Sequence, residues 1–139
     1  MDTVKVGVGT LLIKDELIFL AKRSGSHGEG TWGSSGGHLE FGETLEDCAK
    51  REAYEEFGIQ LRDLRFLCVS NVIDYGSHYL DVEFLSELDD NQVPSIQEPN
   101  KFDIFGWFPF ENLPEPLFKP VEYAIKSFLT GSYYWDKQI

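Results

Sequence analysis

Seven acidic residues stand close together in the segment of residues 37–59. They are Glu40, Glu43, Glu46, Asp47, Glu52, Glu55 and Glu56. Thr44 is a suitable residue to cap the start of a helix, and Gly58 is a suitable stop, because glycine adopts the left-handed conformation at low cost. The sequence therefore predicts a helix over residues 45–57 that carries the last three glutamates.

A helical projection places these three glutamates on or beside the apolar side of the helix. At about 100° per residue, Glu52 and Glu56 fall on that side and Glu55 falls at its edge. Like charges at this spacing repel, and partial burial makes them costlier unless they protonate or bind a cation. The pattern favours a divalent-metal site, with Mg²⁺ expected and Mn²⁺ as a substitute, over a solvated acidic face.

A basic residue, Arg51, adjoins this acidic row, and Glu43 precedes the helix. An ion pair between the two would brace the loop that leads into the helix. The alternative is two separately solvated charges, and the sequence leaves both open.

The spacing of the segment resembles the signature of the Nudix hydrolases, which cleave a nucleoside diphosphate linked to another group. The matching pattern is Gly37, five residues, Glu43, seven residues, Arg51-Glu52-Ala53, one residue, Glu55-Glu56, one residue, Gly58-Ile59. Two positions depart from it: the family prefers a larger aliphatic residue in place of Ala53, and a proline in place of Ser35. So many fixed positions make a chance match very unlikely.

The resemblance implies a set of metal ligands, which are Glu52, Glu55, Glu56 and the Gly36 carbonyl. Glu98 matches an acidic loop position that completes the site in relatives, with a solvated loop glutamate as the alternative. Glu52 is also a candidate for orienting or deprotonating the attacking water, although some relatives place this base outside the signature.

The resemblance also implies contacts to a substrate. Arg23 matches a phosphate-contacting arginine, and the backbone at Gly37 is available to a ligand. We expect base recognition near Gly7 and Thr10, with Phe105 or Trp107 for stacking, although core packing is the alternative for each. His27, in the loop of residues 24–30, is expected to be a mobile surface residue.

Composition limits the class of protein. The chain has 139 residues and a net charge of −12. We expect one domain over residues 1–139, no binding of a nucleic-acid polymer and no membrane partner. Cys48 and Cys68 are expected as core residues in a reducing cytoplasm, because they form no disulfide framework. The chain is expected to be a monomer or a homodimer.

Periodicity predicts strands and helices on both sides of the acidic segment. Strands are expected over residues 4–13, 16–22, 31–34, 64–73, 78–85 and 102–108. A tight turn is expected at Gly36 and Gly37, and a second helix from near Pro120 to Gly131. The long polar loop of residues 86–101 suggests function, and the aromatic tail of residues 132–139 could cover the domain or form a dimer contact. This order indicates an α/β protein in which a mixed sheet lies between helices, the α/β/α sandwich of the Nudix fold.

Weaker matches outside the signature, among them the segments of residues 20–30, 98–102 and 107–114, look like the MutT-like branch. That branch implies a pyrophosphohydrolase that converts a normal or modified (deoxy)nucleoside triphosphate to the monophosphate and pyrophosphate, a role in sanitation of the nucleotide pool. A dinucleoside polyphosphate hydrolase often has a tyrosine near the position of Tyr75. An ADP-ribose hydrolase often has a proline within residues 69–86, where this chain has none. A binding module that has lost catalysis typically has a damaged signature, whereas every acidic position here is intact.

Overall fold

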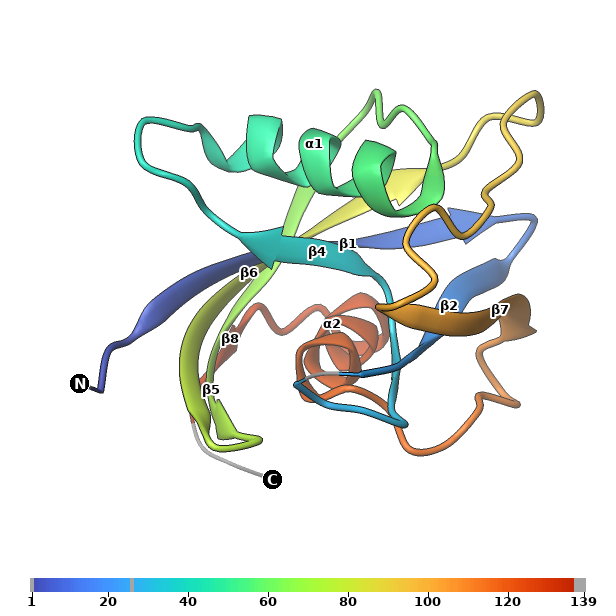
Figure 1. The fold of residues 1–139 in the computed structure, drawn as a ribbon. Coiled ribbons are helices and arrows are strands. Elements are labelled where there is room, and N and C mark those ends of the chain that lie inside the picture. Colours follow the sequence, from blue (N-terminus) through green and yellow to red (C-terminus); the bar gives the residue numbers. More distant parts are fainter. Residues whose placement is uncertain (1, 26, 137–139) are drawn as a thin grey trace.

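A mixed sheet lies between two helices in the computed structural model, which describes residues 2–25 and 27–136 (Figure 1). The elements are β1 (Lys5–Lys14), β2 (Leu17–Arg23), β3 (Trp32–Gly33), β4 (Ser35–His38), α1 (Leu45–Phe57), β5 (Arg65–Asp74), β6 (Ser77–Glu87), β7 (Phe102–Pro109), α2 (Lys119–Thr130) and β8 (Tyr134–Trp135). Helix α1 covers one face of the sheet and α2 covers the other. The predicted α/β/α sandwich is confirmed.

Strand β1 is the centre of the sheet, and the sheet divides along one of its edges. On one edge β1 pairs in parallel with β6 from Lys5 to Ile13. On the other edge it pairs with β4 over its first half, from Gly7 to Thr10, and with β2 only at its end. Strand β4 therefore lies on the first half of β1, directly before the chain enters α1 (Figure 1).

Helix α1 has the predicted bounds because both of its ends are capped as the sequence indicates. The Thr44 hydroxyl accepts a hydrogen bond from the Asp47 amide at 3.1 Å, and Gly58 adopts a left-handed φ of 67°. Beneath the helix, Cys48, Ala49, Ala53 and Phe57 pack in a buried cluster that also includes Val8 of β1. This packing sets the rotation of the helix and hence the direction of its glutamates.

Helix α2 packs on the opposite face of the sheet through an apolar stripe. Val121, Ala124 and Ile125 form a buried cluster with residues of β1, β2 and β5. Pro120 lies in the first turn, and Gly131 ends the helix, as predicted. In the tail, the Trp135 indole donates a hydrogen bond to the Ser127 hydroxyl at 2.6 Å, so this part covers α2. Residues 137–139 of the tail lie outside the described residues.

The expected tight turn at Gly36 and Gly37 is wrong, since both residues lie in strand β4. Gly36 pairs with Gly9, and Gly37 pairs with Val8. Pairing with β1 outweighs the turn propensity of the two glycines here, because two glycine-bearing strands can approach each other closely. A β-carbon on Gly36 would lie 2.8 Å from the Val8 carbonyl oxygen.

The two cysteines, Cys48 and Cys68, are free and buried, as expected. In the described part of the chain, no helix is long and apolar enough to cross a membrane.

Gly36→Ala is expected to lower the free energy of unfolding by roughly 1–3 kcal/mol, because its β-carbon would press on the backbone of β1. Ser35→Ala is the matched control. Ser35 is also buried in β4, and its hydroxyl has no hydrogen-bond partner among the described residues. Urea-induced unfolding should therefore show little change for Ser35→Ala. Equal stability of Gly36→Ala and the wild type would contradict the close contact.

Candidate active site

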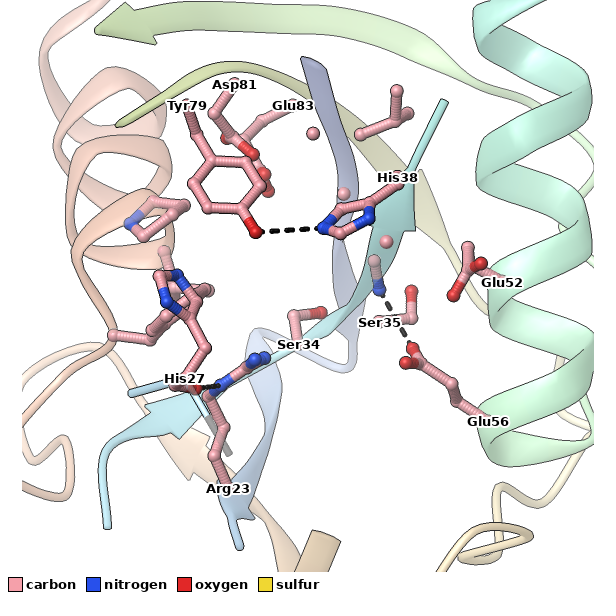
Figure 2. Close-up of a pocket in the computed structure, with 18 of the residues that line it drawn as sticks. Arg23, His27, Ser34, Ser35, His38, Glu52, Glu56, Tyr79, Asp81 and Glu83 are labelled. Carbon is pink, nitrogen blue, oxygen red and sulfur yellow. Dashed lines mark hydrogen bonds between the residues drawn. The ribbon is translucent and has the colours of Figure 1, made fainter. Parts of the chain in front are cut away.

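A pocket of about 560 Å³ lies beside the first half of β1 and opens to solvent. One end is lined by Glu52 and Glu56 of α1 and by the glycines of β4. The other end is lined by residues of β6 together with His27, and Arg23 and Phe118 also line the pocket. Figure 2 shows the two glutamates reaching from α1 towards β4, and Tyr79, Asp81 and Glu83 on the other side of that strand. The size suits a nucleotide-sized ligand.

At the α1 end, glutamate carboxyl groups of α1 lie against the glycine backbone of β4. Glu52 is 7% exposed and Glu56 is 2% exposed. The Gly36 amide donates a hydrogen bond to Glu56 Oε1 at 2.9 Å. A β-carbon on Gly37 would lie 2.4 Å from the Glu52 carboxyl group, so glycine is required for this approach. Glu55 is more exposed, as the helical projection indicates.

Arg51 and Glu43 form the ion pair that the sequence left open. Arg51 Nε donates to Glu43 Oε2 at 2.7 Å, and Nη2 donates to Oε1 at 3.1 Å. Arg51 Nη1 also donates to Glu52 Oε1 at 2.7 Å, and Nη2 donates to the His38 carbonyl at 3.2 Å. The hydrogen bond to Arg51 lowers the pKa of Glu43 to about 2. Arg51 thus joins the loop before α1 to a site glutamate.

Burial raises the pKa of both site glutamates. For Glu52 the Arg51 charge opposes this effect. For Glu56 burial raises the pKa to about 8, and the hydrogen bond from Gly36 opposes it, while the charges of Glu52 and Glu98 add to it. Such clustered carboxylates are stabilised in their charged form when a cation lies among them.

The donor set fits a divalent ion such as Mg²⁺ in chemical type. Glu98 Oε1 is buried without a hydrogen-bond partner among the described residues, although the Lys101 ammonium lies 3.4 Å from it. Within residues 2–25 and 27–136, no three His, Cys, Asp or Glu side chains are placed to hold a metal ion by themselves. Mg²⁺ commonly takes only one or two carboxylates and completes its shell with water and substrate phosphate. The carboxylates of Glu52 and Glu56, with the nearby Gly36 backbone, match that type of site.

Arg23 gives the pocket a half-buried cation. Arg23 Nε donates to the His27 carbonyl at 2.9 Å, and the guanidinium carbon lies 4.0 Å from the Phe118 ring centroid. Burial lowers the pKa of Arg23, and the charge of Glu56 opposes this. The guanidinium of Arg23 is therefore held in place to meet an anion in the pocket.

His27 is not the surface residue that was expected. Its ring centroid lies 5.0 Å from those of Tyr75 and Tyr79 and 5.6 Å from that of Phe118. The left-handed Gly28 turns the loop inward, and its carbonyl accepts a hydrogen bond from the Thr31 hydroxyl. Sequence reasoning missed this because the partners of His27 are distant in the chain.

The structure does not bring Thr10 and Trp107, both predicted to contact substrate, to the pocket. Thr10 is fully buried. It lies two residues after Val8, on the same face of β1, and Val8 packs under α1. Trp107 lies on β7 with its ring centroid 5.5 Å from that of Phe19, so it packs on the core. The predicted residues that do line the pocket are Arg23, Gly36, Gly37, Glu52 and Glu56. Glu55 and Glu98 are near it but do not line it.

The pocket residues that were not predicted include three of β6, namely Tyr79, Asp81 and Glu83. Their alternation with Leu80, Val82 and Phe84 was visible in the sequence and indicated one polar face. The sequence did not show that β6 pairs in parallel with the glycine-bearing strand β1.

Comparison with known proteins gives consistent matches. Residues 3–128 match the family model of the NUDIX domain. A solved MutT NUDIX hydrolase from Burkholderia pseudomallei is 32% identical with a TM-score of 0.85, covering 91% of this chain and 98% of that one. The oxidized purine nucleoside triphosphate hydrolase of Mus musculus is 28% identical over 82% of this chain and 72% of that protein. The NAD-capped RNA hydrolase NudC of Chromobacterium violaceum is 30% identical over 75% of this chain, which spans only 38% of that protein.

Glu56→Gln is expected to stabilise the metal-free protein, and by more at about pH 8 than at about pH 5. The folded pKa of Glu56, about 8, lies above its ordinary value of 4.5. Between these values the unfolded chain has already released the proton, so the stability of the wild type falls as pH rises. Glutamine cannot ionise, and the difference should grow by roughly 3 kcal/mol across this range.

The half-exposed neighbour provides the control, Glu55→Gln, which removes a carboxyl group from the same helix without removing a buried one. Urea-induced unfolding in the presence of a chelator measures both variants. A pH-independent effect of Glu56→Gln would contradict the raised pKa.

Proposed function

The chain belongs to the NUDIX domain family, and we propose that it cleaves a nucleoside triphosphate, with a normal or modified base, to the monophosphate and pyrophosphate. Its class of reaction, hydrolysis of a phosphoric anhydride bond in a nucleotide, follows from the family. The finer proposal rests on one pocket that joins a carboxylate end to an end lined by aromatic rings. Phosphates would lie at the first end and the base at the second. The similarity to the mouse oxidized purine nucleoside triphosphate hydrolase supports this substrate class.

The phosphate end needs charge neutralisation and positioning more than covalent chemistry. A divalent ion held by Glu52, Glu56 and the Gly36 carbonyl, with Glu55 and Glu98 beside them, would neutralise phosphate charge and lower the pKa of a bound water. Arg51 holds Glu52 through Oε1, at 2.7 Å, and so directs the other oxygen to the pocket. We assign Glu52 to orient the attacking water and accept its proton.

Arg23 is assigned to bind the phosphate chain. Its Nε is used by the His27 carbonyl, and Phe118 supports the plane of the guanidinium. The terminal N–H groups can then donate to phosphate oxygens in a fork geometry.

Hydrolysis of a dinucleoside polyphosphate is a weaker alternative, because Tyr75, the residue that suggests it, has a structural role. The Tyr75 hydroxyl accepts a hydrogen bond from the Lys119 amide at 3.0 Å, and its ring stacks on Phe118 at 5.4 Å. Tyr75 thus holds the start of α2, a structural role that needs no second nucleoside.

Cleavage of a nucleoside diphosphate linked to another group, such as ADP-ribose or an NAD cap, is the second alternative. The NAD-capped RNA hydrolases supply that possibility, but the chain spans only 38% of the length of the one described above. A catalytically inactive binding module is disfavoured because the acidic positions are intact and Arg51 orients Glu52.

A screen of nucleotides with Mg²⁺ and identification of products tests the proposed reaction. A nucleoside triphosphate should give monophosphate and pyrophosphate, whereas AMP and ribose phosphate from ADP-ribose alone would overturn it. Glu52→Gln should lower kcat by about 10²- to 10⁴-fold, because it removes the assigned proton acceptor. Retained binding of nucleotide without any turnover would favour the binding module.

Arg23→Gln is expected to lower kcat/KM for a triphosphate by about 10- to 100-fold, because a charge-assisted hydrogen bond to phosphate is lost. The preceding residue of β2 provides the control, Lys22→Gln, since Lys22 does not line the pocket. Steady-state kinetics should show less than about a 2-fold change for the control. Equal effects of the two substitutions would remove Arg23 from the phosphate site.

A further inference from the structure

Two carboxyl groups of β6, those of Asp81 and Glu83, lie against the glycine-bearing half of β1. The parallel register sets Asp81 beside Gly7 and Glu83 beside Gly9. A β-carbon on Gly9 would lie 2.4 Å from Glu83 Oε2, and one on Gly7 would lie 3.0 Å from Asp81 Oδ1. The two glycines therefore make the room that the two carboxyl groups occupy.

Both carboxyl groups are buried and yet line the pocket. Asp81 is 6% exposed and Glu83 is 2% exposed. Figure 2 shows their carboxyl groups close together, on the same side as the Tyr79 ring. Asp81 Oδ2 and Glu83 Oε1 have no hydrogen-bond partner among the described residues. An unsatisfied buried oxygen costs free energy, so this pair is expected to have a ligand that satisfies it.

Burial of two neighbouring carboxyl groups disfavours the ionisation of both at once. Burial raises the pKa of both groups, and the charge of Asp81 raises that of Glu83 further. A hydrogen bond between the two carboxyl groups stabilises the singly protonated pair. With a proton shared between the two groups, each would keep an oxygen that can only accept a hydrogen bond.

We propose, on the basis of the proposed function, that Asp81 and Glu83 recognise the base of the nucleotide and select a purine with two neighbouring N–H donors. The guanine edge has such a pair, N1–H and the exocyclic amino group. The carboxyl group of Asp81 would accept from one donor and that of Glu83 from the other. Thymine and uracil place carbonyl oxygens on both sides of their single N–H, and these oxygens would face the carboxyl oxygens.

The surroundings of the pair fit a base better than the two hydroxyls of a ribose. Tyr79 and His27 line the same end of the pocket and offer aromatic rings that can contact a base. The Tyr79 hydroxyl is within 2.9 Å of His38 Nε2, and this hydrogen bond holds the Tyr79 ring in position. A ribose diol also has two neighbouring donors, so the test must separate these two sources.

Competition among GTP, dGTP and ITP tests the proposal in the full chain. ITP lacks only the exocyclic amino group, and dGTP lacks only the 2′-hydroxyl. GTP should exceed ITP in kcat/KM by about 10-fold or more, because loss of one donor leaves a buried acceptor unpaired. GTP and dGTP should agree within about 3-fold, since the ribose is not the group recognised.

Asp81→Asn and Glu83→Gln should each reduce the ratio of GTP to ITP towards 1, because an amide adds donors where only acceptors stood. Glu87→Gln, an exposed position on the same strand, should keep the wild-type ratio. Should both site variants fail to fold, the comparison of the three nucleotides in the wild type still decides the question.

Calorimetric binding of GMP and IMP in the absence of metal separates this inference from the proposed reaction. A preference for GMP that both variants lose supports base recognition, even where no triphosphate is hydrolysed. Hydrolysis of GTP and ITP at equal rates, with equal binding of GMP and IMP, overturns the inference and leaves the reaction intact. A preference for GTP over dGTP without one for GTP over ITP also overturns it, in favour of the ribose.

Discussion

The close approach of glycine backbone to carboxyl groups is the constraint on which both ends of the pocket depend. At the α1 end, Gly37 of β4 leaves room for Glu52, and the Gly36 amide donates to Glu56 at 2.9 Å. At the β6 end, Gly9 leaves room for Glu83. A side chain at Gly37 or Gly9 would fill the space that a carboxyl group occupies. The same property lets β4 pair with β1 at all, because a β-carbon on Gly36 would meet the β1 backbone. Both the pairing of β4 with β1 and the placement of the carboxyl groups therefore require glycine at these positions.

Buried carboxyl groups at both ends make the pocket costly for the free protein. The two ends differ in how the cost is limited. At the α1 end Arg51 pairs with Glu52 and Glu43, and burial still raises the pKa of Glu56 to about 8. At the β6 end no arginine pairs with Asp81 or Glu83 among the described residues, and burial raises the pKa of both carboxyl groups. Such strain is retained where a ligand relieves it, and the two ends would be relieved by different chemistry: a cation at one and N–H donors at the other.

Local rules predicted those parts of the molecule that depend on neighbours in sequence. Thr44 and Gly58 determined the bounds of α1, and the helical projection explained why Glu52 and Glu56 are buried while Glu55 is not. Prediction failed where partners are distant in the chain. The pair Gly36-Gly37 has turn propensity, but pairing with β1 makes it a strand. His27 is held by aromatic rings from three other elements or loops. Thr10 was assigned to the pocket although strand parity turns it towards α1, because the sequence does not state which face of β1 the pocket uses.

The hydrogen bond between Gly36 and Glu56 has a consequence for how copies of the protein meet. Strand β4 pairs with β1 on one edge, and no other strand covers its second edge within the described residues. An uncovered edge with free amides can add a strand from another molecule and so begin aggregation. Glu56 occupies an amide on β4, and a carboxylate over a strand edge opposes the approach of a second backbone. Glu56, which is assigned to hold the metal, therefore also opposes the pairing of another strand at the open edge of the sheet.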